Sequence, residues 1–288
     1  MTGWTAAELP SFTGRTAIIT GANSGLGAVT ARELSRSGAK VILAVRSTDK
    51  GAAAALEMSG DVEVRQLDLQ NLSSIREFAD GIVDVDVLIN NAGIMATPYT
   101  LTVDGLESQI GTNHLGHFAL TNLLLPKLAN RVVTVSSIMH RIGRINLEDL
   151  NWKSRRYSGW GAYGQSKLAN LLFTSELQRR LDAVSSPLRA LAAHPGYSRT
   201  NLQGHTGRKL GDAFMSASAR MATDSDFGAR QTLYAASQDL PGNTYIGPRF
   251  GILGRTQPVG RSRRARNETT ATALWELSEQ LTGTEFPL

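Results

Sequence analysis

The strongest constraint on the fold of this chain is a regular alternation of short apolar, β-branched runs with helical patterns. Six such runs, which we expect to be strands, span residues 16–20, 40–45, 62–66, 85–90, 131–136 and 188–194. Helical patterns lie between them, at residues 25–37, 49–58, 73–82, 104–128 and 162–181. The runs are apolar on both faces, which is typical of parallel strands covered on both sides. The alternation therefore predicts an α/β fold, a doubly wound parallel sheet of about seven strands with helices on both faces.

Two connections are longer than this alternation requires, at residues 141–160 and 195–227. Long loops at the carboxyl ends of strands are where open α/β sheets bind their ligands. No Pro-, Gly- or Ser-rich linker divides the chain, so we expect a single domain over residues 1–288.

The basic charge of the chain is concentrated in one segment. The 288 residues carry 30 Lys and Arg against 25 Asp and Glu, a formal net charge of +5. Five arginines and no acid lie in residues 255–266, so the rest of the chain is formally neutral. Aromatic residues are not interleaved with these arginines, so we expect no nucleic-acid partner. We expect a solvated loop here, followed by an amphipathic C-terminal helix at residues 267–282.

Other classes of site are excluded or disfavoured by composition. The chain has no cysteine, which excludes disulfides, thiolate metal sites and a cysteine nucleophile. His114 and His117 have a spacing that could place two ligands on one metal, but no third ligand accompanies them, so we expect no metal site. The N-terminus has no signal pattern and no apolar run reaches about 18 residues. We therefore expect no membrane span and a cytoplasmic protein.

A glycine-rich turn follows the first predicted strand and opens a helix. Gly21 allows a tight turn, Gly25 allows a pyrophosphate to approach the backbone, and Gly27 allows the helix to pack near the sheet. The helix N-terminus favours an anion. A glycine triplet alone could be a structural turn, but its place after the first of six strands predicts a nucleotide site. The residues of this turn expected at the cofactor are Gly21, Asn23, Ser24, Gly25, Leu26 and Gly27.

The end of the second predicted strand indicates which nucleotide binds. An NAD site tends to have an acid there, against the ribose 2′-hydroxyl. This strand is followed instead by Arg46, which can pair with a 2′-phosphate. We interpret Asp49, together with Thr48, as helix N-terminal capping. NADP is thus the expected cofactor and NAD the less favoured one, and the alternative is that Arg46 is simply solvent-exposed.

Further motifs carry a family resemblance. Asn90-Asn91-Ala92-Gly93 follows the fourth strand, Ser136-Ser137 closes the fifth, and Tyr163-Gly164-Gln165-Ser166-Lys167 lies on a helix. With the glycine pattern and Asn113, they occur in the order found in the short-chain dehydrogenase/reductase family, which the chain resembles. Residues 20–27, 113–118 and 163–170 look like its retinol-dehydrogenase-like branch. The resemblance implies a single-domain Rossmann fold with a core at about residues 14–254, followed by the basic segment and C-terminal helix as an appendage.

The tyrosine and lysine suggest proton transfer. Moving a hydride between an alcohol carbon and a nicotinamide also requires moving a proton at the oxygen. A phenol has an ordinary pKa of ~10. Lys167, four residues after Tyr163, lies on the same helical face and would favour the phenolate. We therefore expect a lowered pKa for Tyr163, which is our candidate general acid/base.

The remaining site residues follow from the resemblance. Ser137 is expected to hydrogen-bond the substrate oxygen, the chemically identical Ser136 being the alternative. Asn113 resembles the asparagine that holds a water beside the lysine, or it could satisfy local backbone. Asp68 resembles an acid at the adenine amine, though a helix cap is a fair alternative. Tyr163 and Lys167 are also expected at the cofactor, together with Leu69, Asn90, Ala92, Gly93, Pro195, Gly196 and Thr200.

These features predict an oxidoreductase that acts on a hydrophobic alcohol, aldehyde or ketone. The side chains that could line an apolar pocket, or instead form local core, are Met139, Trp160, Tyr197, Phe214, Met215 and Met221. A catalytically silent NADP-binding sensor is the alternative. The resemblance also implies a possible homodimer or homotetramer formed through the helices at residues 104–128 and 162–181.

Overall fold

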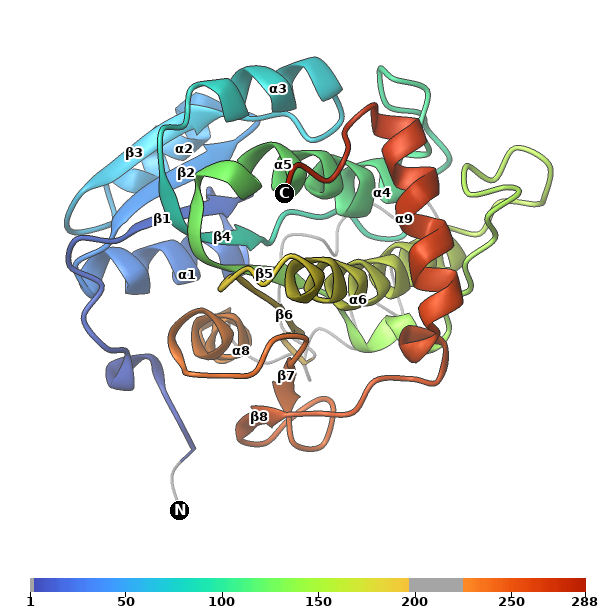
Figure 1. Ribbon diagram of the computed structural model, residues 1–288. Coiled ribbons are helices and arrows are strands. Elements are labelled where there is room, and N and C mark those ends of the chain that lie inside the picture. Colours follow the sequence, from blue (N-terminus) through green and yellow to red (C-terminus); the bar gives the residue numbers. More distant parts are fainter. Residues whose placement is uncertain (1–2, 197–224) are drawn as a thin grey trace.

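A computed structural model describes residues 3–196 and 225–288, and these form an eight-stranded sheet with helices on both faces (Figure 1). The strand order is β3-β2-β1-β4-β5-β6-β7-β8. Strands β1 to β7 are parallel and β8 pairs antiparallel with β7. The strands are β1 (Thr16–Thr20), β2 (Lys40–Val45), β3 (Val62–Gln66), β4 (Val85–Asn90), β5 (Leu128–Val135), β6 (Arg189–Ala193), β7 (Tyr245–Pro248) and β8 (Thr256–Pro258). The predicted doubly wound parallel sheet is confirmed.

The strand order reverses between β1 and β4. From β1 the chain moves outward to β2 and β3, and it then returns to place β4 on the other side of β1. The loops that follow β1 and β4 consequently leave the sheet in opposite directions. In open α/β sheets the crevice at this point is the usual ligand site.

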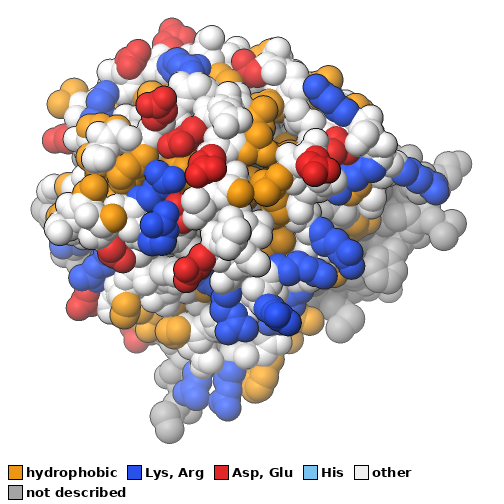
Figure 2. Space-filling view, turned by 45° about the vertical axis from the view of Figure 1, so that its right-hand side comes forward, with side chains coloured by type: hydrophobic (Ala, Val, Ile, Leu, Met, Phe, Trp, Pro, Cys, Tyr) orange, Lys and Arg blue, Asp and Glu red, His pale blue; other side chains and the backbone are white. Residues whose placement is uncertain are grey.

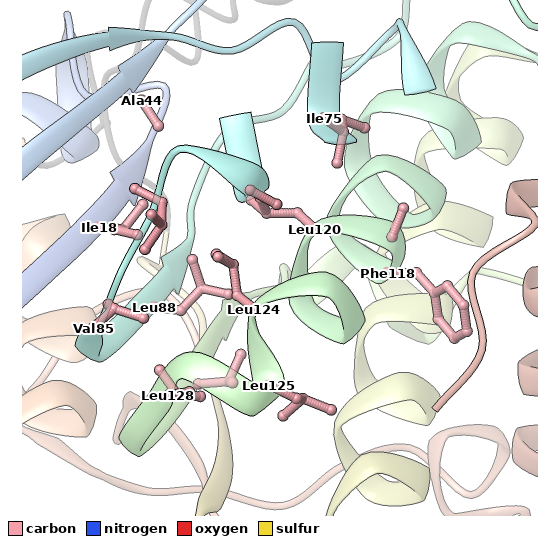
Figure 3. Close-up of a cluster of buried hydrophobic side chains, with 14 of the residues drawn as sticks. Ile18, Ala44, Ile75, Val85, Leu88, Phe118, Leu120, Leu124, Leu125 and Leu128 are labelled. Atoms are coloured by element: carbon pink, nitrogen blue, oxygen red, sulfur yellow. The ribbon is translucent and has the colours of Figure 1, made fainter. Parts of the chain in front are cut away.

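Alternate residues of the central strands contribute to hydrophobic cores on the two faces of the sheet. Ile18, Leu88 and Val132 point to one face, beneath α3 (Leu72–Asp80), α5 (Gly116–Leu124) and α6 (Gly159–Ala183). Part of this core is drawn in Figure 3, where Leu120 and Leu124 of α5 lie nearer to Ile18 and Leu88 than Phe118 does. Ile19 and Val133 point to the other face, where α1 (Gly25–Arg36) and α8 (Ser225–Ser237) pack. This two-sided burial explains why the strands are apolar on both faces.

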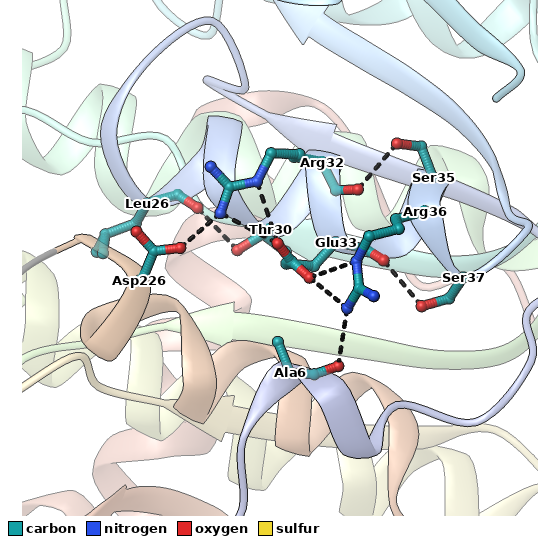
Figure 4. A network of polar contacts seen from close by, with 9 residues as sticks. All are labelled: Ala6, Leu26, Thr30, Arg32, Glu33, Ser35, Arg36, Ser37 and Asp226. Carbon is teal, nitrogen blue, oxygen red and sulfur yellow. Dashed lines mark hydrogen bonds and ion pairs between the residues drawn. The ribbon is translucent and has the colours of Figure 1, made fainter. Parts of the chain in front are cut away.

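A polar network ties α1 to its neighbours (Figure 4). Arg32 forms an ion pair with Asp226 of α8, and Arg36 donates to Glu33 and to the carbonyl of Ala6. Partly exposed pairs of this kind add little stability each. They do connect the helix that follows the glycine-rich turn to α8 and to the N-terminal segment.

The helix predicted at residues 104–128 begins later and is divided. Asp104 lies outside it and accepts a hydrogen bond from the backbone of Leu72 at 3.0 Å. The helix begins instead with α4 (Ser108–Ile110), where the Glu107 carboxylate caps the first turn, and continues through a π-helical turn (Gly111–Leu115) into α5. Helix α6 begins at Gly159, three residues before the predicted start, because Ser158 caps it. Helix α2 (Thr48–Ala55) is capped by Ser47, which corrects the capping role given to Thr48 and Asp49.

The expectation of a solvated loop at residues 255–266 is wrong in part. The segment contains β8, Ala265 is fully buried, and the Arg261 guanidinium donates to Ser175 and to the carbonyl of Asn243. The predicted C-terminal helix is present as α9 (Glu268–Thr282) and lies across α6. Its Trp275, 1% exposed, lies 4.8 Å from the Phe118 ring. Lys and Arg side chains predominate in the lower half of the face shown in Figure 2.

Among the described residues, no helix is both long enough and apolar enough to span a membrane. Helix α9 packs against both α5 and α6, the two helices through which we expected an oligomer to form. The face of α6 that α9 covers is therefore not available to a second copy of the chain.

Candidate active site

The glycine-rich turn between β1 and α1 has the shape of a cradle. Gly21 and Gly25 have positive φ angles of 65° and 56°, a region that favours glycine. A Cβ on Gly27 would lie 2.5 Å from the carbonyl oxygen of Gly21. Ser24, the N-cap residue of α1, makes no side-chain capping bond. In helices α2, α3, α6 and α9 a side chain makes that bond. The first N–H groups of α1 are thus available to an anion such as a pyrophosphate.

Thr20 connects the loops that follow β1 and β4, at the point where the strand order reverses. Its hydroxyl accepts from the backbone N–H groups of Asn91 and Ala92, both at 2.9 Å, and contacts His117 Nε2 at 2.8 Å. His117 Nδ1 lies 3.1 Å from the carbonyl oxygen of Asn113, which can only accept, so the Thr20 hydroxyl donates to Nε2. The side chain of Asn91 donates to the carbonyl of Thr20 at 2.8 Å. This network positions the loop that contains Ala92 and Gly93 beside the glycine-rich turn.

Sequence reasoning missed this network. Thr20, Asn91 and His117 are separated by up to 97 residues, and no local pattern links them. Asn90, which we expected at the cofactor, is 1% exposed and donates to Thr121 of α5. The Asn90 side chain therefore faces the interior, and the asparagine side chain at the turn is that of Asn91.

The side chains of His114 and His117 have different hydrogen-bond partners and do not point toward a common metal position. His114 Nε2 lies 3.1 Å from the hydroxyl of Ser278 in α9, whereas the ring nitrogens of His117 contact Thr20 and Asn113. Burial lowers the pKa of each ring to about 3, so both are neutral at pH 7. Among the described residues there is no group of three or more side chains that could hold a metal.

Arg46 and Asp68 follow the ends of β2 and β3. Arg46 is exposed, and its guanidinium makes no hydrogen bond or ion pair with any described residue. Asp68 accepts from the backbone of Gln70 at 3.0 Å, while Asn71 caps α3, so the helix-capping alternative for Asp68 is wrong. The Leu69 side chain is buried in the core, which leaves only its backbone for a cofactor contact.

Asn113 lies in the π-helical turn and is fully buried. Its side chain accepts from the N–H of Ile94 at 2.8 Å and donates to the carbonyl of Ile94 at 2.9 Å. It also donates to Ser166 of α6 at 2.9 Å. A Cβ on Gly93 would lie 3.1 Å from Asn113 Oδ1 and 3.5 Å from Lys167 Nζ, so these three residues converge. Single π turns are frequent at functional sites.

The two serines after β5 have different partners. Ser136, 2% exposed, donates to the carbonyl of Lys167 at 2.8 Å. Ser137 accepts from the N–H of Met139 at 3.2 Å and faces the phenol of Tyr163, whose pKa it lowers. Successive side chains therefore face different surroundings, and only Ser137 contacts the tyrosine.

Tyr163 and Lys167 lie buried on one face of α6. The Lys167 ammonium lies 5.7 Å from the Tyr163 ring centroid and donates to the carbonyl of Val135 at 3.1 Å. Burial raises the pKa of Tyr163 to about 12, and the bond from Ser137 offsets this only in part. Burial also lowers the pKa of Lys167 to about 8. The expected lowering of the tyrosine pKa is therefore wrong for this structure, because loss of hydration dominates for the phenolate.

The turn after β6 brings Pro195 and Gly196 to the same edge of the sheet. Gly196 has a φ of 73°, and a Cβ there would lie 2.4 Å from the carbonyl oxygen of Ile252. Trp160 is 37% exposed, with its ring 6.4 Å from that of Tyr163, and Met139 is half-buried. The other expected site and pocket residues lie outside the described residues, namely Tyr197, Thr200, Phe214, Met215 and Met221.

The chain is similar to known proteins along its whole length. Residues 15–211 match the family described as short chain dehydrogenase. Retinol dehydrogenase 13 of Homo sapiens is 42% identical over 306 residues, covering 100% of this chain and 90% of the relative. Retinol dehydrogenase 12 of Homo sapiens is 41% identical over 298 residues, with 97% and 89% covered.

Solved structures agree in fold. The crystal structure of an uncharacterized protein from Mycobacterium Paratuberculosis is 73% identical, with a TM-score of 0.90 and 100% of both chains covered. A short chain dehydrogenase from Burkholderia cenocepacia J2315, in complex with NADP, is 21% identical with a TM-score of 0.64 and 84% and 98% covered. The chain therefore belongs to the short-chain dehydrogenase/reductase family of oxidoreductases, whose members bind NAD(P), and it is similar to the retinol dehydrogenases within that family.

Proposed function

We propose that this enzyme reduces a hydrophobic aldehyde or ketone with NADPH, or catalyses the reverse oxidation, using Tyr163 as general acid/base. The observation that carries the proposal is the convergence of Ser137, Tyr163 and Lys167 at the end of β5 and on α6. Asn113 joins them through Ser166 and Gly93. A hydroxyl, a phenol and a buried ammonium side by side can hold a carbonyl oxygen and supply a proton to it.

The cradle fits a dinucleotide. The uncapped N-terminus of α1 and the backbone of Gly21 and Gly25 would hold the pyrophosphate. Arg46 is free of partners among the described residues and can pair with a 2′-phosphate, which favours NADP over NAD. Asp68 would lie at the adenine, and Gly93, Pro195 and Gly196 would lie nearer the nicotinamide.

The proton chemistry follows from the buried groups. When bound, NADPH supplies the hydride that the carbonyl carbon accepts. The carbonyl oxygen, held by the Ser137 hydroxyl, takes its proton from the Tyr163 phenol, which its raised pKa keeps protonated at pH 7. The Lys167 ammonium, with a pKa of about 8, is mostly protonated at pH 7 and stabilises the phenolate that remains.

The substrate class follows from the apolar surroundings and from the relatives. Trp160 presents a partly exposed aromatic surface beside Tyr163. The similar retinol dehydrogenases are named for an apolar alcohol. A retinoid or another long apolar carbonyl compound is therefore the first candidate.

The test compares two cofactors and two variants. Purified enzyme is assayed with NADPH or NADH and a panel of apolar aldehydes and ketones, following the absorbance of the reduced nicotinamide. We expect turnover with NADPH, and we expect Arg46→Ala to raise the KM for NADPH far more than that for NADH. Equal effects on both would contradict the NADP assignment. NADPH binding without turnover of any compound, unaltered by Tyr163→Phe, would favour the nucleotide-sensor alternative.

A further inference from the structure

A cleft of about 490 Å³ lies between the turn after Ser137 and the hairpin of β7 and β8. None of the four residues proposed for catalysis lines it. The lining residues are Ile138, His140, Arg141, His194, Tyr245, Pro248, Arg249, Phe250, Gly251, Gln257, Pro258, Val259 and Gly260. The cleft is thus formed by the turn at residues 138–141, by the ends of β6 and β7, and by residues 257–260 of the basic segment.

The charge of this cleft is of one sign. Among the described residues, Arg141 and Arg249 line the cleft and no Asp or Glu does. Both arginines are exposed, and neither guanidinium has a hydrogen bond or ion pair to a described residue. Two guanidinium groups without a counter-charge favour an anionic ligand, and their planar N–H groups suit a carboxylate in particular.

His194 adds a buried donor. The backbone N–H of Gly196 donates to His194 Nδ1 at 3.3 Å, and burial lowers the ring pKa to about 4, so the neutral ring carries its proton on Nε2. The side chain is 4% exposed, and Nε2–H has no partner among the described residues. A Cβ on Gly247 would lie 2.1 Å from this nitrogen, so close packing holds the ring in place. His194 lines the cleft, so its Nε2–H can donate to the acceptor of a ligand bound there.

His140, in contrast, has no free ring nitrogen. Its Nε2 accepts from the backbone N–H of Ser262 at 3.2 Å, and its Nδ1 donates to the carbonyl of Ser137 at 2.7 Å. His140 therefore forms the wall of the cleft and does not supply a donor to a ligand.

The remaining walls are largely apolar. Ile138, Phe250 and Val259 contribute hydrocarbon surface, with Pro248 and Pro258 beside them. We propose that the cleft binds an organic carboxylate with a short apolar body, its carboxylate held by Arg141, Arg249 and His194. This inference is independent of the proposed function, because it concerns binding at residues that take no part in the proton transfer.

Calorimetric titration of the full-length chain with octanoate tests the proposal. We expect saturable binding of one octanoate per chain, with Arg141→Gln and Arg249→Gln each weakening it about tenfold, the effect of losing one charge-assisted hydrogen bond. Arg144→Gln is the matched control, since Arg144 is an exposed arginine three residues from Arg141 that does not line the cleft. We expect its affinity to equal that of the wild type.

Further ligands and one variant complete the test. Octanol and inorganic phosphate should each bind at least tenfold more weakly than octanoate, because one lacks the charge and the other the apolar body. His194→Phe, which retains a ring of similar size, should also weaken binding, and the two arginine variants serve if this variant fails to fold. Absence of octanoate binding, equal weakening by Arg144→Gln, or competition with the carbonyl substrate that persists in Arg141→Gln would each overturn the proposal.

Discussion

Replacing each of the two serines after β5 by alanine separates structure from catalysis. Ser136→Ala removes a buried hydrogen bond of 2.8 Å to the carbonyl of Lys167, which costs about 1 kcal/mol of stability. Ser137→Ala removes a cap bond of 3.2 Å to Met139, which also costs about 1 kcal/mol. The two variants should therefore unfold at similar denaturant concentrations. Of the two serines, only Ser137 faces the Tyr163 phenol, so we expect only its loss to remove a donor from the substrate oxygen.

The expected kinetic difference is large. Loss of one positioned donor to a developing oxyanion lowers kcat by about 100-fold or more, which corresponds to about 3 kcal/mol of transition-state stabilisation. We therefore expect Ser137→Ala to lose about 100-fold in kcat and Ser136→Ala to lose less than about fivefold. The assay is steady-state NADPH oxidation with an apolar aldehyde, combined with urea unfolding of each variant. Equal losses of kcat in both variants, or a larger loss in Ser136→Ala, would refute the assignment.

Three further predictions concern stability and assembly. Burial lowers the pKa of His114 and His117 to about 3 and that of His194 to about 4. Below pH 6.5 the unfolded chain binds more protons than the folded chain, so the free energy of unfolding should fall as the pH decreases, by up to about 2 kcal/mol per histidine at pH 5. A free energy of unfolding in urea that stays constant from pH 7 to pH 5 would contradict this. Trp275→Ala should lower the free energy of unfolding by about 3–5 kcal/mol, because the ring is buried between Phe118 and Phe173. A decrease of less than about 1 kcal/mol would show that α9 is loosely packed. Because α9 covers α6, light scattering should give the monomer mass of 31.0 kDa, and a dimer cross-linked through α6 would contradict this.

Much of the fold could be predicted because its signals are local. The two-sided apolar runs indicated six parallel strands, and β1 to β4 match their predicted bounds. Strand β7 is only four residues long and β8 three, too short to give a recognisable pattern. Helix α4, which continues into the π turn, begins where the Glu107 carboxylate caps it. The helical periodicity of the sequence does not indicate this starting point.

The identities of the site residues could be predicted from the sequence, but their pKa values and contacts could not. Tyr163, Lys167 and Ser137 could be identified from motif order. The direction of the Tyr163 pKa could not, because it depends on burial produced by the whole fold. The Thr20–His117 contact joins residues on different elements, and only the folded chain brings them together. For the same reason the basic segment was taken as a solvated loop, although Arg261 bonds Ser175 of α6.

Single-turnover reduction tests the central claim most directly. Enzyme saturated with NADPH is mixed with an apolar aldehyde in a stopped-flow instrument, and the loss of nicotinamide absorbance is compared between wild type and Tyr163→Phe. General acid catalysis contributes about 10²–10⁴-fold, so we expect the variant to be slower by that factor while its NADPH affinity is retained. A Tyr163→Phe variant that transfers hydride as fast as the wild type would contradict the account.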